Sequence, residues 1–277
     1  MVTGTDFQGW SLASWEREFA YIYDPRDERL SISDMWLLLV ESASKVAEYL
    51  RRYKFEKALN ELPVVFCLTC RFNNKCRKDV DADFHINTFE EIVWSKYPYT
   101  CLLCGGEDQC ICPIWRHVFE EMSDPDKAAH LGRMKSKLQQ RKLSQRNRLV
   151  PTLDGFADLF KDLYKGAHYE KPLDGMGFHF MEEVGEVSEA IRKIKEKLPD
   201  TPSSELDKLT RALEEEIADV FSWTNSLIIK LGSLLGDPDL KLSSQVWQVF
   251  KDGTGQRMSC PECRKLPCER KCVPTLE

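Results

Sequence analysis

The chain has 277 residues and a formal net charge of -6 at pH 7. This length predicts about two domains with ample core, and the modest acidity gives no general attraction to nucleic acids or membranes. The longest apolar run, MWLLLV at 35–40, is far too short to span a bilayer, and the N-terminus MVTGTDFQGW lacks the basic-then-apolar pattern of a signal peptide. We therefore expect a cytoplasmic protein without membrane contact, whose eleven cysteines serve a purpose other than disulfide bonding.

Two predicted helices near the start of the chain recur later at one constant offset. A shift of 141 positions places residues 12–23 on 153–164 and residues 40–52 on 181–193 without a gap, so that Phe19 falls on Phe160. Because a single shift serves two amphipathic segments, we infer a tandem duplication. The predicted domains are, in chain order, a first repeat at 1–122, a basic connector at 123–150 and a second repeat at 151–277.

The first repeat contains a group of three cysteines in CLTCRFNNKC, namely Cys67, Cys70 and Cys76, with His85 as the nearest fourth donor. Three cysteines packed as small apolar residues are the simpler interpretation. The C-x-x-C spacing favours a zinc site modestly over that interpretation. If zinc binds here, it replaces part of a helical core.

Each repeat is followed by a denser group of cysteines. The candidate ligands are Cys101, Cys104, Cys110 and Cys112 after the first repeat, and Cys260, Cys263, Cys268 and Cys272 after the second. Four thiolates in a short stretch that opens with C-x-x-C suit tetrahedral Zn²⁺. Because four protein ligands leave no open position on the metal, we expect this zinc to be structural.

The connector between the repeats is strongly basic. Residues 126–150 carry eight lysines and arginines with one aspartate and few large apolar side chains. This composition is typical of a solvated helix or linker, and contact with a nucleic acid or nucleotide is the sharper alternative.

Carboxylates recur in two predicted helices of the second repeat, at 180–193 and 213–223. Positions three or four apart share a helix face. By this spacing Glu183 and Glu186 lie on the apolar stripe of the first helix, and Glu216 and Asp219 lie on that of the second. The stripes are Phe180, Val187, Ala190 and Ile194 on the first helix, and Leu209, Ala212, Leu213, Val220, Trp223 and Leu227 on the second. The side chains expected on the opposite, solvated faces are Glu182, Glu189, Lys193, Glu196, Glu214, Glu215 and Ser222.

Ionised carboxylates on a core-facing stripe are unfavourable unless something replaces their lost water, and four of them also repel one another. Divalent cations remove both difficulties, and oxygen ligands in this number suit Mg²⁺ or Mn²⁺. Pairing with lysines or arginines inside a helix bundle is the alternative.

The motifs themselves are E-x-x-E at Glu183 and Glu186, within EEVGE, and E-x-x-D at Glu216 and Asp219, ahead of the aromatic residues of DVFSW. Over residues 150–235 the chain resembles the MazG-like all-α nucleotide pyrophosphohydrolases. The 29 residues between Glu186 and Glu216 are at or just beyond the long end of the family spacing, and the turn KLPDTPSSE accounts for the extra length. With the duplication, the resemblance implies an all-α protein of two MazG-like repeats, each followed by a small zinc-binding loop.

The resemblance implies hydrolysis of a nucleoside triphosphate to the monophosphate and pyrophosphate. Glu183, Glu186, Glu216 and Asp219 would hold Mg²⁺, which lowers the pKa of a bound water, and Glu182 would orient or deprotonate that water. The cations that we expect nearest to the triphosphate are Lys165, Lys171, Arg192, Lys193 and Lys230.

The first repeat lacks these ligands, because Ser42 and Lys45 occupy the positions of Glu183 and Glu186 and no E-x-x-D helix follows. Lys45 either contacts phosphate or forms a salt bridge, and the salt bridge is the simpler interpretation. The resemblance suggests that the degenerate repeat stands in for a partner subunit as an internal pseudo-dimer. Further association into a homo-oligomer is left open.

Two other function classes compete with this enzyme. One is a zinc-containing adaptor for nucleic acid, nucleotide or protein on the same scaffold, and the other is an enzyme that senses a modified or signalling nucleotide. No P-loop or dinucleotide fingerprint appears in the sequence. The histidines interpreted as ordinary surface or core residues are His117, His130, His168 and His179.

Overall fold

The computed structural model describes most of the chain. The described residues are 7–79, 86–98, 101, 106, 121–145, 152–164, 170–197 and 202–268. Among them, no helix combines the length and the hydropathy needed to cross a membrane.

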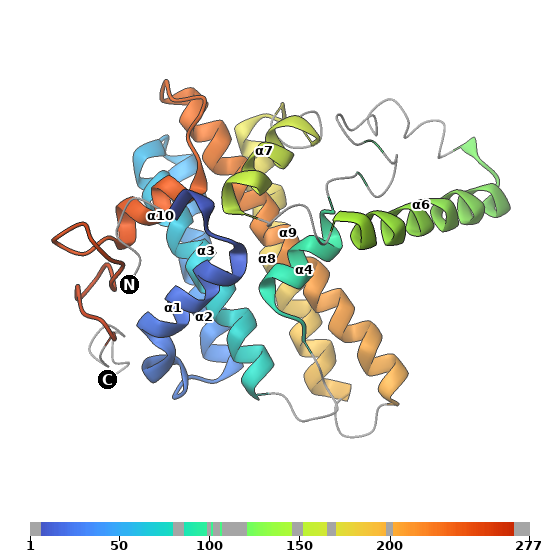
Figure 1. Ribbon diagram of the computed structural model, residues 1–277, viewed down its shortest axis with the longest axis horizontal. Coiled ribbons are helices and arrows are strands. Elements are labelled where there is room, and N and C mark those ends of the chain that lie inside the picture. The colour runs from blue at the N-terminus through green and yellow to red at the C-terminus, as the bar shows by residue number, and fades with distance from the viewer. Residues whose placement is uncertain are drawn as a thin grey trace.

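The described chain is all α-helical, with nine α-helices, one 3-10 helix and no strand beyond isolated bridges. In chain order the elements are η1 Phe7–Gly9, α1 Leu12–Asp27, α2 Ile32–Arg51, α3 Phe55–Asp79, α4 Phe89–Lys96, α6 Asp124–Gln145, α7 Leu153–Asp162, α8 Leu173–Lys197, α9 Ser203–Leu234 and α10 Leu242–Phe250. Figure 1 shows the helices gathered into one bundle from which α6 extends.

Side-chain caps fix where several helices begin. Ser31 before α2 and Thr88 before α4 each form a reciprocal capping box with an acidic residue three positions later. Ser11 before α1 and Thr152 before α7 each accept a hydrogen bond from the backbone N–H three residues ahead. These caps satisfy N–H groups that a helix N-terminus leaves without an internal partner.

The helices on either side of α6 form two halves, η1 to α4 and α7 to α10, whose members correspond in pairs. Helix α1 begins 141 residues before α7, and α2 begins 141 residues before α8. The caps Ser11 and Thr152 keep the same offset, and these two residues pair with each other as an isolated antiparallel bridge. Reciprocal pairing of equivalent residues is what a local two-fold axis produces.

The long helices α3 and α9 cross at the centre of the bundle, where they belong to one hydrophobic core shared by both halves. They correspond at an offset of 155, which relates Phe66 to Phe221. Phe66 packs 5.7 Å from Phe19, as Phe221 packs 5.9 Å from Phe160, and the Phe66 and Phe221 ring centroids lie 5.8 Å apart. Four phenylalanine rings, two from each half, therefore pack in a row across the contact between the halves.

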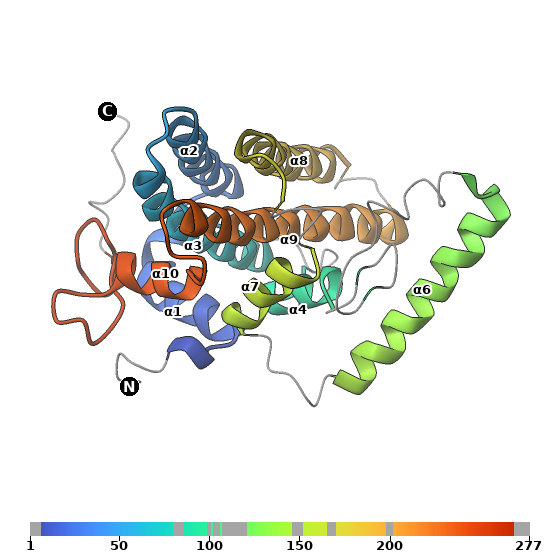
Figure 2. The same cartoon turned by 90° about the horizontal axis from the view of Figure 1, so that it is seen from above.

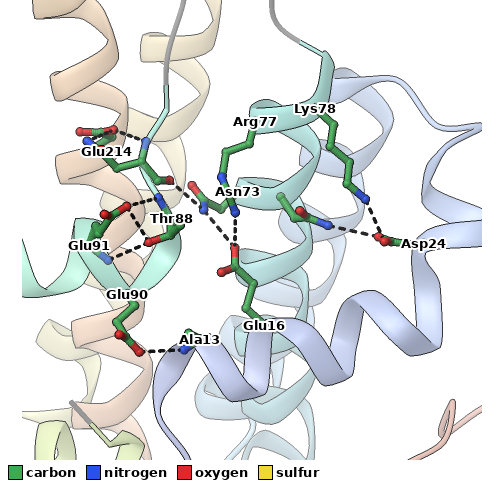
Figure 3. Close-up of polar contacts among 12 residues, drawn as sticks. Ala13, Glu16, Asp24, Asn73, Arg77, Lys78, Thr88, Glu90, Glu91 and Glu214 are labelled. Carbon is green, nitrogen blue, oxygen red and sulfur yellow. Dashed lines mark hydrogen bonds and ion pairs between the residues drawn. The ribbon is translucent and has the colours of Figure 1, made fainter. Parts of the chain in front are cut away.

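The short helices α4 and α10 each pack on the long helix of the opposite half, α4 on α9 and α10 on α3 (Figure 2). Polar contacts position α4 between α1 and α9 (Figure 3): a Glu90 carboxylate oxygen accepts a hydrogen bond from the Ala13 backbone N–H of α1 at 2.9 Å, and Glu214 of α9 accepts two from Asn87 at 2.8 and 2.9 Å. The expectation that Glu214 is only solvated is therefore wrong, because it anchors the segment that leads into α4.

Buried Glu16 lies beside α3 in the same region, near Asn73 and Arg77 (Figure 3). Burial raises the pKa of its carboxyl, and the nearby Arg77 charge lowers it by less. The basic connector is a helix, α6, over most of the predicted segment, which agrees with one of the two forms expected for it.

Candidate functional site

The predicted carboxylates come together between α8 and α9, which pack side by side. Phe180, Val187, Ala190 and Ile194 are buried as the stripe predicts, and α8 thereby turns Glu183 toward α9. One carboxylate oxygen from each of Glu183, Glu216 and Asp219 lies within 4.8 Å of the others. All three side chains are half-buried.

The fourth predicted ligand, Glu186, is at the edge of this cluster. It is exposed, and it shares a hydrogen bond with Glu216. The stripe on α9 also differs from the prediction, because Ala212 is exposed and Ser222 is fully buried. Helix α9 is central and is covered on nearly every side from Val220 onward, so a single apolar stripe does not describe it.

Three side chains outside the predicted set hold the carboxylates in place. The Trp223 indole N–H donates to Glu183 Oε1 at 3.2 Å. The Tyr97 hydroxyl donates a short hydrogen bond to Asp219, and Lys96 Nζ lies 3.1 Å from the other Asp219 oxygen. Lys96 is the last residue of α4 and Tyr97 follows it, so the first half contributes to a cluster whose carboxylates all belong to the second.

Burial and mutual repulsion raise the pKa of all three carboxyls. Burial, reinforced by the charges of Asp219 and Glu186, raises the pKa of Glu183 to about 7, although the Trp223 hydrogen bond opposes the shift. Burial, together with the hydrogen bond that protonated Glu216 donates to the Glu186 carboxylate, raises the pKa of Glu216 to about 8. Burial also raises the pKa of Asp219, despite the lowering effect of Lys96. The site therefore attracts positive charge beyond what one lysine supplies.

The donor set fits a hard divalent cation. Its three converging groups are carboxylate oxygens, the ligands that Mg²⁺ and Mn²⁺ prefer. Metal binding requires ionised ligands, and a cation here would offset the repulsion that keeps Glu183 and Glu216 protonated.

A second layer of side chains covers Trp223. The His179 ring stacks on the Trp223 ring with centroids 5.0 Å apart, and Lys171 Nζ lies 2.9 Å from His179 Nε2. Glu182 lies 3.1 Å from His179 Nδ1 and is exposed. The structure thus places Glu182 against a histidine that stacks on Trp223, beside the carboxylate cluster and not within it.

The predicted phosphate ligands are scattered. Lys171 lies near the cluster through His179, whereas Arg192 and Lys193 form exposed ion pairs with Glu196 and Glu189, about 10 Å or more along α8 from Glu183. Lys230 lies further along α9, beyond Trp223. The structure adds a small cavity of about 110 Å³ between α4 and α9, with Lys96 and Arg211 in its wall.

The first half has no comparable cluster among its described residues. Ser42 donates a hydrogen bond to Glu61 at 2.7 Å, and Lys45 forms a salt bridge with Glu41 at 2.8 Å. The simpler interpretation of Lys45 is therefore confirmed.

The second group of potential metal ligands consists of thiols. The sulfur atoms of Cys260, Cys263 and Cys268 lie within 4.8 Å of one another in the loop after α10, and they could hold a metal ion such as zinc. Cys260 and Cys268 are buried, and Cys263 is half-buried.

The cysteines of α3 are arranged differently. Cys67, Cys70 and Cys76 are buried core residues of one continuous helix, and by themselves they form no group of three ligands within 4.8 Å. Helix α3 is continuous here, and its C-x-x-C places both thiols on the inward face, as the simpler interpretation expects. A zinc site that includes His85 stays a prediction. Cys101 is buried, and its N–H donates to the Gly106 carbonyl at 2.8 Å. The predicted metal and phosphate ligands outside the described ranges are His85, Cys104, Cys110, Cys112, Lys165 and Cys272, and His117 and His168 also lie outside them.

Comparisons with protein-family models, with curated proteins and with solved structures find no match for this chain. What the chain does is therefore inferred from its residues and their geometry.

Proposed function

We propose that the protein is a magnesium-dependent nucleotide pyrophosphohydrolase, which converts a nucleoside triphosphate or related nucleotide to the monophosphate and pyrophosphate. The observation that carries the proposal is the convergence of Glu183, Glu216 and Asp219, half-buried and with too few neighbouring cations. A purely structural role explains this poorly, because three carboxylates that share one lysine near a core destabilise the fold. The resemblance of the two motifs to MazG-like enzymes supplies the reaction.

The carboxylates would hold Mg²⁺, which neutralises phosphate oxygens and lowers the pKa of a bound water. Trp223 and Tyr97 keep Glu183 and Asp219 in fixed orientations through hydrogen bonds. Lys96 offsets the charge of Asp219 in the free protein. The Lys96 ammonium and Arg211, which line the same cavity, would contact phosphate oxygens of the substrate.

Glu182 has a different task in this proposal. Because it is exposed and bonded to His179, we assign it to positioning the layer over Trp223 rather than to deprotonating water. The second half thus carries the metal ligands, and the first half supplies Lys96 and Tyr97 from α4. In this sense the degenerate half acts as the partner subunit of an internal pseudo-dimer.

The test is a panel of nucleoside triphosphates and their deoxy forms incubated with the full chain and Mg²⁺, with pyrophosphate release as the readout. We expect release from at least one nucleotide, dependence on Mg²⁺ or Mn²⁺, and loss of about 10- to 100-fold in rate for Lys96→Gln. Glu189→Gln, on the exposed face of α8, is the matched control and keeps full activity.

Two results would contradict the proposal. One is the absence of pyrophosphate release across the panel together with no Mg²⁺ binding by calorimetry. The other is wild-type hydrolysis by a Glu216→Gln variant. In either case the carboxylates are structural, and the adaptor function becomes the better account of the scaffold.

A further inference from the structure

The loop after α10 is a compact turn built around three thiols. The Cys260 N–H donates to the Lys265 carbonyl at 3.2 Å, and the Arg264 N–H returns to the Cys260 carbonyl at 2.8 Å. This turn brings Cys263 Sγ within 3.9 Å of Cys268 Sγ, with Cys260 Sγ close to both. A tetrahedron of zinc–sulfur bonds about 2.3 Å long has edges of about 3.8 Å, which matches the Cys263 to Cys268 separation.

The residue that follows the C-x-x-C sequence is held in an unfavourable backbone conformation. Arg264 has φ of 57°, in the left-handed region that non-glycine residues adopt rarely. Its guanidinium donates to the Lys251 carbonyl at 3.0 Å, which ties the turn to the end of α10. Surrounding contacts therefore fix this turn, as strained conformations require.

The same loop is seated on a helix of the other half. The Cys268 backbone N–H donates to the Ile22 carbonyl of α1 at 2.7 Å. Tyr23, the next residue of α1, is 3% exposed and hydrogen-bonds through its side chain to Cys260. The Arg71 guanidinium lies 4.0 Å from the centroid of the Tyr23 ring and forms two hydrogen bonds with Asp27, at 2.6 and 2.8 Å. The thiols thus rest on an ordered polar and aromatic platform of the first half.

We propose that Cys260, Cys263 and Cys268 bind one zinc ion, and that this ion fastens the loop of the second half onto α1 of the first. Clustered thiolates are the donor set that zinc prefers, and Tyr23 positions Cys260 as an outer hydrogen-bond partner. Zinc bound by a short loop contributes directly to folding that loop. The metal therefore stabilises the pairing of the halves, a role separate from the carboxylate site.

Metal content tests the site. We compare the zinc bound per chain, measured by elemental mass spectrometry, for the wild type, Cys263→Ser and Ser259→Ala. Cys263 is the least buried of the three thiols. Ser259 is a neighbour whose buried hydroxyl has no hydrogen-bond partner among the described residues, so its loss removes no ligand. We expect the serine variant of Cys263 to bind one zinc fewer than the other two proteins. Unchanged zinc in that variant, or a disulfide between Cys263 and Cys268 in the intact wild type, would overturn the proposal.

Hydrogen exchange tests whether the zinc ion stabilises the contact between this loop and α1. Losing the metal should speed amide exchange at Cys268 and in peptides covering the second half of α1, while peptides of α8 stay unchanged. Tyr23→Phe keeps the aromatic packing and should retain zinc, yet release it to a chelator about 10-fold faster. Equal exchange of α1 with and without zinc, or an unchanged release rate for Tyr23→Phe, would show that the ion does not join the halves. Neither readout involves a nucleotide, so failure here leaves the proposed hydrolysis untouched.

Discussion

Helices α2 and α3 in the first half pack as α8 and α9 do in the second, but their equivalent positions carry different chemistry. The offset of 141 relates Ser42 to Glu183, and the offset of 155 relates Glu61 to Glu216. The Ser42 hydroxyl donates one hydrogen bond to the Glu61 carboxylate, whereas Glu183 and Glu216 belong to a cluster of carboxylates that repel one another. The helix pair therefore does not need the carboxylates in order to pack. Their presence in one half alone favours a function that offsets their effect on stability.

The largest expected effect comes from breaking the contact that both halves share. Phe66→Ala removes a fully buried ring that touches Phe19, Phe89 and Phe221. We expect a loss of about 3–5 kcal/mol in unfolding free energy, because the surrounding rings cannot close the cavity. Chemical denaturation followed by circular dichroism measures it. A loss below about 1 kcal/mol would mean that the halves are joined mainly by other contacts.

The next effect distinguishes the two helix pairs directly. Glu216→Gln should lower hydrolysis by about 100- to 1,000-fold, because one metal ligand and its charge are lost. The same variant should melt at an equal or higher temperature in EDTA, because repulsion is relieved. Glu61→Gln changes the equivalent residue of the first half and should keep full activity. Equal loss of activity in both variants would show that the halves are not functionally different.

A smaller effect is the dependence of stability on pH without metal. Glu183 and Glu216 hold protons up to about pH 7 and 8 in the folded protein, whereas an unfolded glutamate releases its proton near 4.5. The folded state binds more protons in that window, so stability falls as pH rises from about 4.5 to 8. Allowing for solvent screening, we expect about 1 kcal/mol, or 2–4 °C in melting temperature. Mg²⁺ at pH 8 should reverse the fall, and Glu216→Gln should flatten it; an identical slope in that variant would contradict this assignment.

The smallest effect concerns the hydrogen bond that occupies the equivalent place in the first half. Ser42→Ala removes the hydroxyl that donates to Glu61, and we expect it to lower the unfolding free energy by about 1 kcal/mol. Activity should not change. Thermal melts beside pyrophosphate assays check both statements, and a drop in activity without a drop in stability would point to a functional role for this pair.

The helical fold was readable from the sequence because amphipathic spacing and a constant offset are local patterns. Both pairs of helices begin 141 residues apart, as the offset predicts. The four motif carboxylates were found for the same reason, and three of them converge. The burial of individual side chains was harder to predict. Whether Glu186 and Ser222 are exposed or buried depends on which other helices cover α8 and α9.

Lys96 and Tyr97 were not predicted, because they reach Asp219 across more than 120 residues of sequence. A signal for them did exist. Trp94 and Trp247 occupy matching places in α4 and α10, at an offset of 153 that extends the duplication. Extending the repeat this far would have indicated that α4 packs on the opposite half and ends beside the carboxylates.

The loop that ends at Cys268 has a consequence for how the chain is made. Helix α1 leaves the ribosome early, yet its Ile22 carbonyl and Tyr23 hydroxyl receive their partners Cys268 and Cys260 only after some 240 further residues have been translated. Helix α3 likewise waits for α9 and α10. Contacts so distant in sequence form late, and the first half meanwhile exposes apolar surface that chaperones recognise. We therefore expect the nascent first half to depend on holding factors until the second half is complete.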